Sequence, residues 1–233
     1  MAQTTQIFGR SVNRIAKLMI FAGVPMALGV LSLVWYMFGW SDWHRDVGKE
    51  VPQPGGGFSH VLHVNQKIDC RYCHTSVEVS SSANIPPTET CMGCHSQVLS
   101  QSAKLQFVRD SWATGVPIQW NKVHDLPKFV YFNHSIHVSK GVGCSTCHGN
   151  LAKMNVVYKT QALYMGWCLD CHRDPAQYLR PQEEIYNPAW VPPADQPVRG
   201  RQLLIEYGIE QYQSETGSGQ KINRLTNCSI CHR

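Results

Sequence analysis

The cysteines of this sequence all occur in one five-residue pattern. The pattern is C-x-x-C-H, it occurs five times, and it uses all ten cysteines. It is typical of c-type haem attachment, in which two thiols bond to the porphyrin and the histidine that follows can bind the iron. The sequence therefore predicts five covalently attached c-type haems. Their predicted attachment residues are Cys70, Cys73, Cys91, Cys94, Cys144, Cys147, Cys168, Cys171, Cys228 and Cys231, and the histidines that follow are His74, His95, His148, His172 and His232.

Three other uses of C-x-x-C explain less of this pattern. Zinc ribbons combine two such pairs into one four-ligand site, and five copies do not pair off. Disulfides suit an oxidising compartment but give no reason for five following histidines. A thioredoxin-like redox motif needs a βαβ context, and the sequence shows no such alternation of strand and helix patterns.

Each haem iron also needs a second axial ligand, since otherwise it keeps an open site where a substrate could bind. Six of the eleven histidines lie outside the C-x-x-C-H patterns, and one of them, His44, closely follows a long apolar run. The match between five irons and five remaining histidines predicts bis-histidine haems. The predicted distal ligands are His60, His63, His124, His134 and His137, with Met154 and Met165 as alternatives.

Two stretches repeat each other at an offset of 74 residues. Residues 58–74 and 132–148 share a phenylalanine, two histidines, a valine and the C-x-x-C-H pattern without a gap, and another such pattern follows each. We interpret this as a duplication that gives two dihaem modules, with a lone fifth haem at the C-terminal end. The two histidines of each F-x-H-x-x-H segment share one helical face, about 5–6 Å apart at Cβ, so they can serve two neighbouring irons.

This spacing predicts the haems that each distal histidine serves. The histidines of one F-x-H-x-x-H segment serve the haems of their own module, and the remaining histidine serves the fifth haem, although ligands can also cross between modules. The predicted sets are His60 and His63 with the haems at Cys70 and Cys91, His134 and His137 with those at Cys144 and Cys168, and His124 with the one at Cys228.

The N-terminal region contains a candidate membrane anchor. Residues 18–40 form 23 consecutive positions without Asp, Glu, Lys or Arg, enough to span a hydrocarbon core of about 30 Å. Residues 1–17 are basic, residues 41–46 are charge-balanced, and Trp35, Tyr36, Trp40 and Trp43 cluster at the far end. We therefore expect a cytoplasmic N-terminus and a head outside the cytoplasm. A cleaved signal peptide is the alternative, but its apolar stretch would be shorter, with a small-residue cleavage site.

We expect a mostly irregular head with short α-helices, in which porphyrins replace a conventional core. The clearest predicted helix runs from Gln97 to Ala113, a second from about Arg199 to Gln213, and no stretch alternates enough to predict a sheet. Six prolines between Pro175 and Pro197 predict an extended arm, laid over another surface or around its own head. The expected divisions are a cytoplasmic 1–17, an anchor 18–40, a linker 41–57, dihaem modules 58–131 (with a connecting helix) and 132–172, a Pro-rich arm and helix 173–227, and the fifth haem motif 228–233.

The formal net charge of +5 is too small and too scattered to predict nucleic-acid binding. Most of the excess comes from the three basic residues before the apolar run. Two propionates on each of five haems would outweigh what remains. We therefore expect an acidic haem-loaded head, which could steer a basic redox partner.

The layout of one anchor, two F-x-H-x-x-H modules and a terminal C-x-x-C-H resembles the pentahaem cytochrome c subunit of bacterial alternative complex III. The segments Lys122–Pro127, Phe132–His137 and Met165–Arg173 carry the rest of this likeness. The single modules resemble the wider class III (c₃/c₇-like) cytochromes. The resemblance implies electron relay within a quinol-oxidising complex, without a catalytic site of its own. It also implies, as partners, integral-membrane quinol-oxidising subunits, an iron–sulfur protein, a monohaem cytochrome c, and a periplasmic carrier or terminal oxidase.

Two other functions stay open. The first is a quinol dehydrogenase of the type that donates to periplasmic nitrate or nitrite reductases; such proteins often carry methionine two residues after a motif histidine, where this chain has Ser76. The second is a multihaem reductase with a five-coordinate catalytic haem. Five spare histidines, and the lack of a C-x-x-C-K-like pattern, count against it.

Overall fold

A computed structural model of the chain describes residues 9–39, 46–215 and 221–232. The chain divides into two structural units, residues 1–45 and residues 46–233, and we call the second unit the head. Trp40, Trp43 and His44, which the sequence analysis considered, lie outside the described residues. Each unit is described by itself below.

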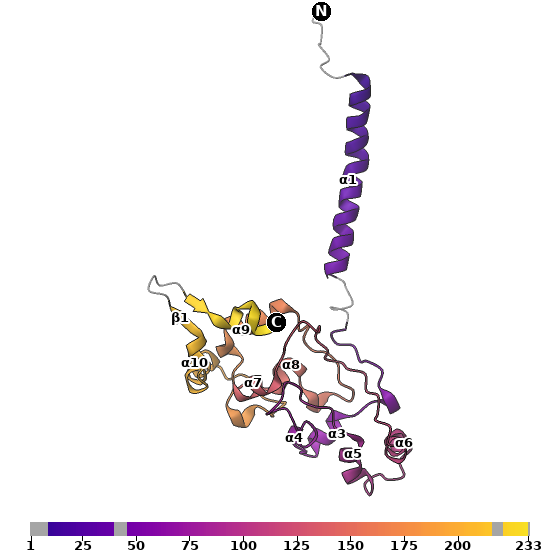
Figure 1. Ribbon diagram of the computed structural model, residues 1–233, viewed down its shortest axis with the longest axis vertical. Helices are drawn as coiled ribbons and strands as arrows, with labels where there is room; N and C mark the ends of the chain where they lie inside the picture. The colour runs from indigo at the N-terminus through magenta and orange to yellow at the C-terminus, as the bar shows by residue number, and fades with distance from the viewer. Residues whose placement is uncertain (1–8, 40–45, 216–220, 233) are drawn as a thin grey trace, which may run out of the picture. The chain divides into compact units, whose positions relative to one another are not determined.

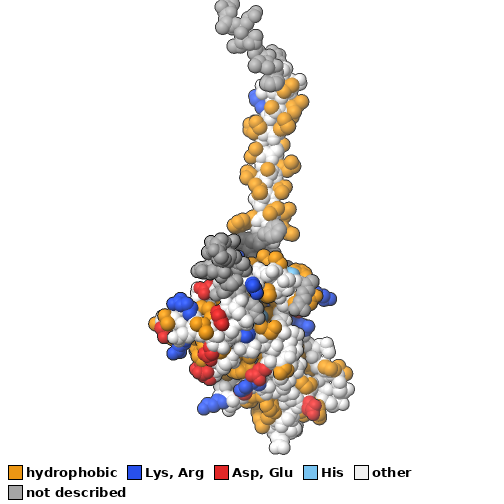
Figure 2. Space-filling model, turned by 60° about the vertical axis from the view of Figure 1, so that its left-hand side comes forward, with side chains coloured by type: hydrophobic (Ala, Val, Ile, Leu, Met, Phe, Trp, Pro, Cys, Tyr) orange, Lys and Arg blue, Asp and Glu red, His pale blue; other side chains and the backbone are white. Residues whose placement is uncertain are grey.

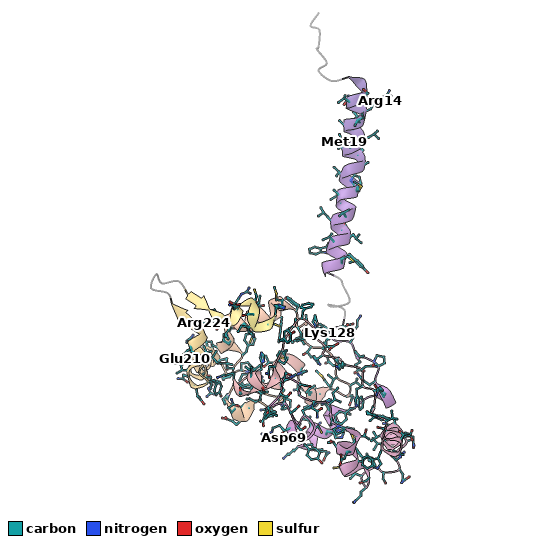
Figure 3. All side chains as sticks on the ribbon, in the orientation of Figure 1. Arg14, Met19, Asp69, Lys128, Glu210 and Arg224 are labelled. Atoms are coloured by element: carbon teal, nitrogen blue, oxygen red, sulfur yellow. The ribbon has the colours of Figure 1, made fainter. Side chains whose placement is uncertain are left out.

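The first unit contains one long helix, α1 (Arg10–Gly39). Its segment Ser11–Met37 is long enough to cross a membrane and contains an 18-residue window with a mean hydropathy of 2.1. Apolar side chains project from it on all sides, as Figures 2 and 3 show. A helix that is apolar all round suits a lipid environment. Pro25 lies inside α1, and membrane helices tolerate such a residue.

The head consists of short helices joined by loops (Figure 1). Helices α5 and α6 lie at one end, α10 and a hairpin lie at the other, and α7 and α8 lie between them. The α-helices are α3 (His60–Asn65), α4 (Cys70–Cys73), α5 (Thr88–His95), α6 (Gln106–Thr114), α7 (His134–Ser139), α8 (Cys144–His148), α9 (Met165–Arg173), α10 (Gln196–Glu206) and α11 (Cys228–Cys231). The 3₁₀ turns are η1 (Pro54–Gly56), η2 (Ala103–Leu105), η3 (Leu151–Lys153), η4 (Pro175–Gln177), η5 (Gln182–Glu184), η6 (Glu210–Tyr212) and η7 (Arg224–Thr226).

The two cysteines of each C-x-x-C-H pattern lie in one helical segment, and the histidine either lies in the same segment or directly follows it. The residue before the first cysteine caps this segment in two cases: Asp69 accepts a hydrogen bond from the backbone of Arg71, and Asn227 accepts one from Ser229. Short polar side chains at this position satisfy backbone N–H groups that the helix leaves free. In these two motifs the cap fixes where the helical turn begins.

Helices α3 and α7, which carry the F-x-H-x-x-H histidines, pack reciprocally against the opposite modules. Helix α3 of the first module packs against η3, and the backbone of Val61 donates a hydrogen bond to Met154. Helix α7 of the second module meets residues 80–81 of the first, where the backbone of His134 bonds to Ser81 at 3.2 Å. The two modules are therefore joined by exchanged contacts.

Among the described residues of the head, buried apolar side chains form two small clusters. One joins η4 to α10 through Ala176, Leu179, Leu203, Leu204 and Ile209. The other joins the two modules to the Pro-rich segment through Val77, Val138 and Ile185. The Pro-rich segment therefore packs on its own head, which was one of the two expectations for it.

The first predicted helix is shorter than expected. The chain turns through residues 97–101 and η2, and α6 begins only at Gln106. Leu99 has a left-handed φ of 54°, which interrupts the helix. The side chain of Arg109 donates hydrogen bonds to the carbonyls of Ser100 and Ser102, which satisfies the loop backbone. The prediction of one continuous helix over residues 97–113 was wrong.

The second predicted helix is shifted along the sequence. Helix α10 begins three residues before the expected start, with Pro197 in its first turn, and it ends before Gly208, whose φ is 62°. Proline favours a first turn and glycine favours the end of a helix. The mostly helical, irregular head agrees with the expected fold class, with one small addition that no alternating pattern predicted. A small antiparallel pair, β1 (Gln213–Glu215) with β2 (Lys221–Asn223), follows α10.

Candidate haem sites

The two F-x-H-x-x-H segments have nearly the same local geometry. The ring of Phe58 stacks on the ring of His63, with 4.3 Å between their centroids, and meets the ring of His60 edge-on, with 4.8 Å between centroids. The ring of Phe132 stacks on His137 at 4.4 Å and meets His134 edge-on at 4.8 Å. The repeat in the sequence is therefore a repeat in structure, and the phenylalanine of each segment fixes the orientation of both histidines.

Seven of the ten predicted iron ligands donate a hydrogen bond from Nδ1 to a backbone carbonyl. Such a bond fixes the tautomer and leaves Nε2 available for a metal. The contacts are short, between 2.7 and 3.1 Å. The pairs are His63 with Ser59, His74 with Asn84, His95 with Val98, His134 with Ser81, His137 with Asn133, His172 with Leu225, and His232 with Phe129.

Three distal candidates face a motif histidine at the separation that a shared iron requires. Metal–imidazole bonds are about 2 Å long, so two imidazole rings on one iron have centroids about 6 Å apart. The observed centroid distances are 6.1, 6.2 and 6.4 Å, for His63 with His95, His137 with His172 and His134 with His148. Each of these pairs falls within its predicted set, so these residues fit axial ligation of haem.

The middle of the head gathers five imidazoles. Burial, and then the neighbouring histidines His124, His134, His74 and His60, together lower the pKa of His148 to about 3. Burial likewise lowers the pKa of His60 and of His124 to about 4, and lowers that of His137. These rings are therefore neutral near pH 7, as a metal ligand must be. Because His74 and His148 both belong to this group, the motifs at Cys70 and Cys144 lie close together.

Two of these buried rings lack a partner at one nitrogen. They are His60 at Nδ1 and His124 at Nε2. A buried polar atom without a partner is costly, and it points to a group that the protein is built to receive. Haem iron is such a group, so this observation supports the fit of the imidazoles to the cofactor.

The structure places His124 differently from its predicted role. Its ring lies 4.3 Å from that of His148, beside the third motif. His232 of the fifth motif instead stacks against Phe129 at 5.9 Å. The pairing of His124 with the haem at Cys228 stays a prediction that these contacts do not favour. Of the alternative ligands, Met154 is buried, 3% exposed, and Met165 is 65% exposed.

None of the ten cysteines forms a disulfide, so all ten remain available for bonds to porphyrin. Burial, followed by the charge of nearby groups, raises the pKa of Cys144 to about 11 and that of Cys147 and Cys171 to about 12. Within the described ranges no three His, Cys, Asp or Glu side chains are grouped to hold a bare metal ion. A haem iron needs only two protein ligands, because the porphyrin supplies four.

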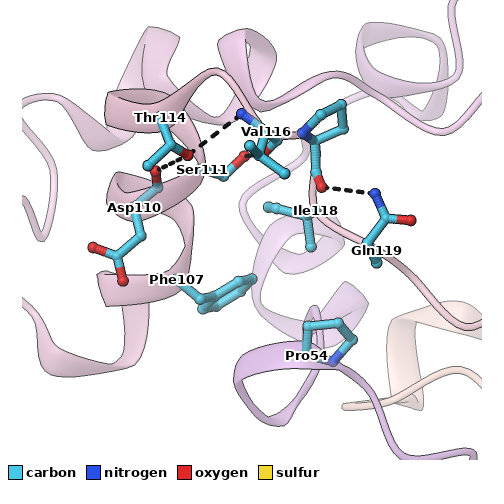
Figure 4. A pocket seen from close by; sticks show the side chains of 9 residues that line it. Pro54, Phe107, Asp110, Ser111, Thr114, Val116, Ile118 and Gln119 are labelled. Atoms are coloured by element: carbon cyan, nitrogen blue, oxygen red, sulfur yellow. Dashed lines mark hydrogen bonds between the residues drawn. The ribbon is translucent and has the colours of Figure 1, made fainter.

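One pocket lies apart from the histidines and carries none of this chemistry. It is a shallow depression of about 270 Å³ between η1, α6 and the loop that follows α6 (Figure 4). Its lining is mostly apolar, with Pro54, Phe107 and Ile118 among the residues that form it.

A buried arginine beside the third motif was missed by the sequence analysis. Arg180, from the Pro-rich segment, donates hydrogen bonds to the side chains of Ser145 and Thr146, the two residues between Cys144 and Cys147. The sequence repeat contains one feature that could have indicated a buried side chain at this motif. At the offset of 74 residues, Gly143 stands where the first module has Asp69, which frees space before the first cysteine.

Comparisons with known proteins agree with this geometry. Residues 130–233 match the family described as cytochrome c7 and related cytochrome c. The chain is also similar to the menaquinone reductase multihaem cytochrome c subunit of Nitratidesulfovibrio vulgaris. The two are 30% identical over 176 residues, which cover 65% of this chain and 79% of the relative. The histidine geometry and both similarities agree, and the chain belongs to the multihaem cytochrome c family.

Proposed function

We propose that this chain is a membrane-anchored pentahaem cytochrome that relays electrons between quinone-reactive membrane subunits and a carrier outside the cytoplasm. The observation that carries this proposal is the set of imidazole pairs at 6.1, 6.2 and 6.4 Å, each containing a C-x-x-C-H histidine. The name of the N. vulgaris relative supports the link to quinone. Bound haem supplies reversible one-electron chemistry at iron.

The protein's own residues position and enclose these redox centres. The Nδ1 bonds hold seven of the ten imidazoles in one tautomer and one orientation, so little reorganisation would accompany a change of charge at a metal bound to them. An imidazole on both sides of an iron closes its axial positions to substrates. The gathering of His60, His74 and His148 in the middle of the head brings two attachment motifs close together. This arrangement favours transfer between cofactors over chemistry at any one of them.

Helix α1 supplies the anchor in this proposal. The basic residues Arg10, Arg14 and Lys17 precede its most apolar part, which places the N-terminus in the cytoplasm by the positive-inside rule. The head then lies on the periplasmic side of a bacterial inner membrane. Protease accessibility of the head in intact spheroplasts tests this orientation.

The proposed assembly is the alternative complex III type, in which this chain accepts electrons from integral-membrane quinol-oxidising subunits. Its other partners would be an iron–sulfur protein, a monohaem cytochrome c and a periplasmic carrier. The relative's name, a menaquinone reductase subunit, favours a second candidate in which the same relay delivers electrons to quinone. The two candidates differ only in the direction of electron flow.

Two sets of measurements test the proposal, one of the haems and one of the reaction with quinol. Intact mass and a pyridine haemochrome assay of the full chain should give five haems, and low-temperature EPR should show bis-histidine ligation. In stopped-flow mixing, a quinol should not reduce the isolated chain but should reduce the same chain in the purified complex. Rapid reduction of the isolated chain would instead favour a quinol dehydrogenase. Fewer than five haems would overturn the pentahaem proposal.

A further inference from the structure

The side chain of Arg180 is almost completely buried, with 2% of its surface exposed. Its guanidinium lies over the ring of Trp190 at 4.2 Å. It donates to the Ser145 hydroxyl at 3.2 Å and to the Thr146 hydroxyl at 3.0 Å, so two of its contacts lie inside the third C-x-x-C-H motif. The guanidinium is held from both sides, by the motif and by the indole ring.

The third motif begins with a residue that makes space for this arginine. A Cβ atom at Gly143 would lie 2.2 Å from the Arg180 Cζ atom, far inside van der Waals contact. The backbone of Arg180 is tied to the same segment, since its N–H donates to the Gly141 carbonyl at 2.9 Å. The absence of a side chain at Gly143 therefore lets the guanidinium approach the attachment helix α8 directly.

The charge of Arg180 is not neutralised by an ion pair within the described part of the chain. Its further partners are the carbonyls of Glu184 and Asn187, both at 3.4 Å, and its Nε atom is buried without a partner. Glu184 is the acidic group that acts on it, and an oxygen of that carboxylate accepts a hydrogen bond from Asn187. A guanidinium stays protonated even when it is buried.

The equivalent motif of the first module contains an arginine that is exposed and ion-paired, unlike Arg180. Arg71 lies between Cys70 and Cys73, is exposed, and forms ion pairs with Asp69 at 2.9 Å and with Glu78 at 3.4 Å. Solvent and two carboxylates therefore screen its charge. The two motifs have the same spacing, but only the one at Cys144 has a buried, unpaired positive charge beside it.

We propose that Arg180 raises the reduction potential of the haem attached at Cys144 and Cys147. Reduction of a ferric haem adds one electron to the site, and a nearby positive charge in a low-dielectric environment stabilises the reduced state. This proposal rests on the proposed function only in requiring haem at this motif. It makes the haem at Cys144 a better electron acceptor than the one at Cys70.

The test uses the full haem-loaded chain in detergent and three substitutions. Arg180→Gln removes the charge, Arg180→Lys retains it, and Arg71→Gln is the matched control in the first module. Potentiometric titration followed by the haem absorbance gives the sum of the midpoint potentials from the area of the curve, without assigning single haems. We expect Arg180→Gln to lower this sum, Arg180→Lys to restore most of it, and Arg71→Gln to change it much less.

A second pair of variants keeps the arginine in place. Ser145→Asp puts a carboxylate next to the Arg180 guanidinium, and Ser145→Asn is its uncharged control. Ser145→Asp should lower the sum as Arg180→Gln does, and Ser145→Asn should not. Equal titration curves for wild type, Arg180→Gln and Ser145→Asp would overturn the proposal. Peptide mass spectrometry of residues 144–147 separates this result from a failure of haem attachment, which would instead contradict the proposed function.

Discussion

The two modules of the head hold their histidines in the same way but differ in what surrounds them. In both, a phenylalanine stacks on the second histidine of the F-x-H-x-x-H segment, at 4.3 and 4.4 Å. In the first module, residues 58–131, the described buried residues are Val77, Val108 and Ser111. The second module is covered by the Pro-rich segment, where Leu179, Arg180 and Ile185 are buried.

This difference between the modules shows that two parts of the sequence have different roles. The short repeated segment sets the ligand geometry, because its contacts are local. The non-repeated segment after residue 173 sets the environment of the ligands, because it packs on both modules but adds a buried positive charge beside only one of them. A duplicated pair of haem sites can thus acquire different properties without a change in its ligands.

Removal of a distal histidine should have the largest effect, and the same effect in both modules. We expect His63→Ala and His137→Ala each to open one axial position and so to give about one carbon monoxide-binding haem per molecule. Carbon monoxide difference spectra measure this, with the wild-type chain as the control that binds almost none. A response from only one of the two variants would contradict the equivalence of the modules.

Loss of apolar contact in the covering segment should have the next largest effect. Leu179 is 1% exposed, and Leu179→Ala should lower the free energy of unfolding by about 2–5 kcal/mol through the cavity that it leaves. The control is Ile205→Ala on the exposed side of α10, with an expected change of at most about 0.5 kcal/mol. Denaturant titration of both variants measures the difference. Equal midpoints would show that the covering segment is not part of the core.

The glycine beside the third motif should be less tolerant than the one inside the second. Gly143→Ala displaces the Arg180 guanidinium, and we expect a loss of about 1–3 kcal/mol in the free energy of unfolding. A Cβ at Gly93, in α5, meets only the Tyr72 hydroxyl at 3.6 Å. Gly93→Ala should therefore be neutral or stabilising, by up to about 1 kcal/mol. The same denaturant titration checks both, and a stable Gly143→Ala would argue against the close approach.

The exposed ion pair of the first motif should have the smallest effect. A hydrogen bond from Arg71 lowers the pKa of Asp69, so the pair stabilises the fold above the ordinary aspartate pKa of about 3.9. This contribution is lost as the pH falls through the lower pKa of the folded state. Asp69→Asn should shift the denaturation midpoint only slightly at neutral pH, and not at all in high salt. A large shift that persists in high salt would show that the charge is not screened.

The motifs and the repeat could be predicted from the sequence, because cofactor attachment and ligand spacing are local patterns. The three imidazole pairs fall within predicted sets for the same reason. The helix start at Gln106 could not be predicted, since it depends on the left-handed Leu99 and on the bonds of Arg109 to the preceding loop. Arg180 was missed because it meets Ser145 only after the Pro-rich segment folds back.

The contacts that α3 and α7 exchange between the two modules determine which fragments of the chain can keep these helices supported. Each half of the duplication supplies the surface on which the other half's histidine helix rests, through Val61 with Met154 and His134 with Ser81. A fragment that ends between the halves would leave both helices without their support. We therefore expect neither half of the repeat to fold as an independent unit.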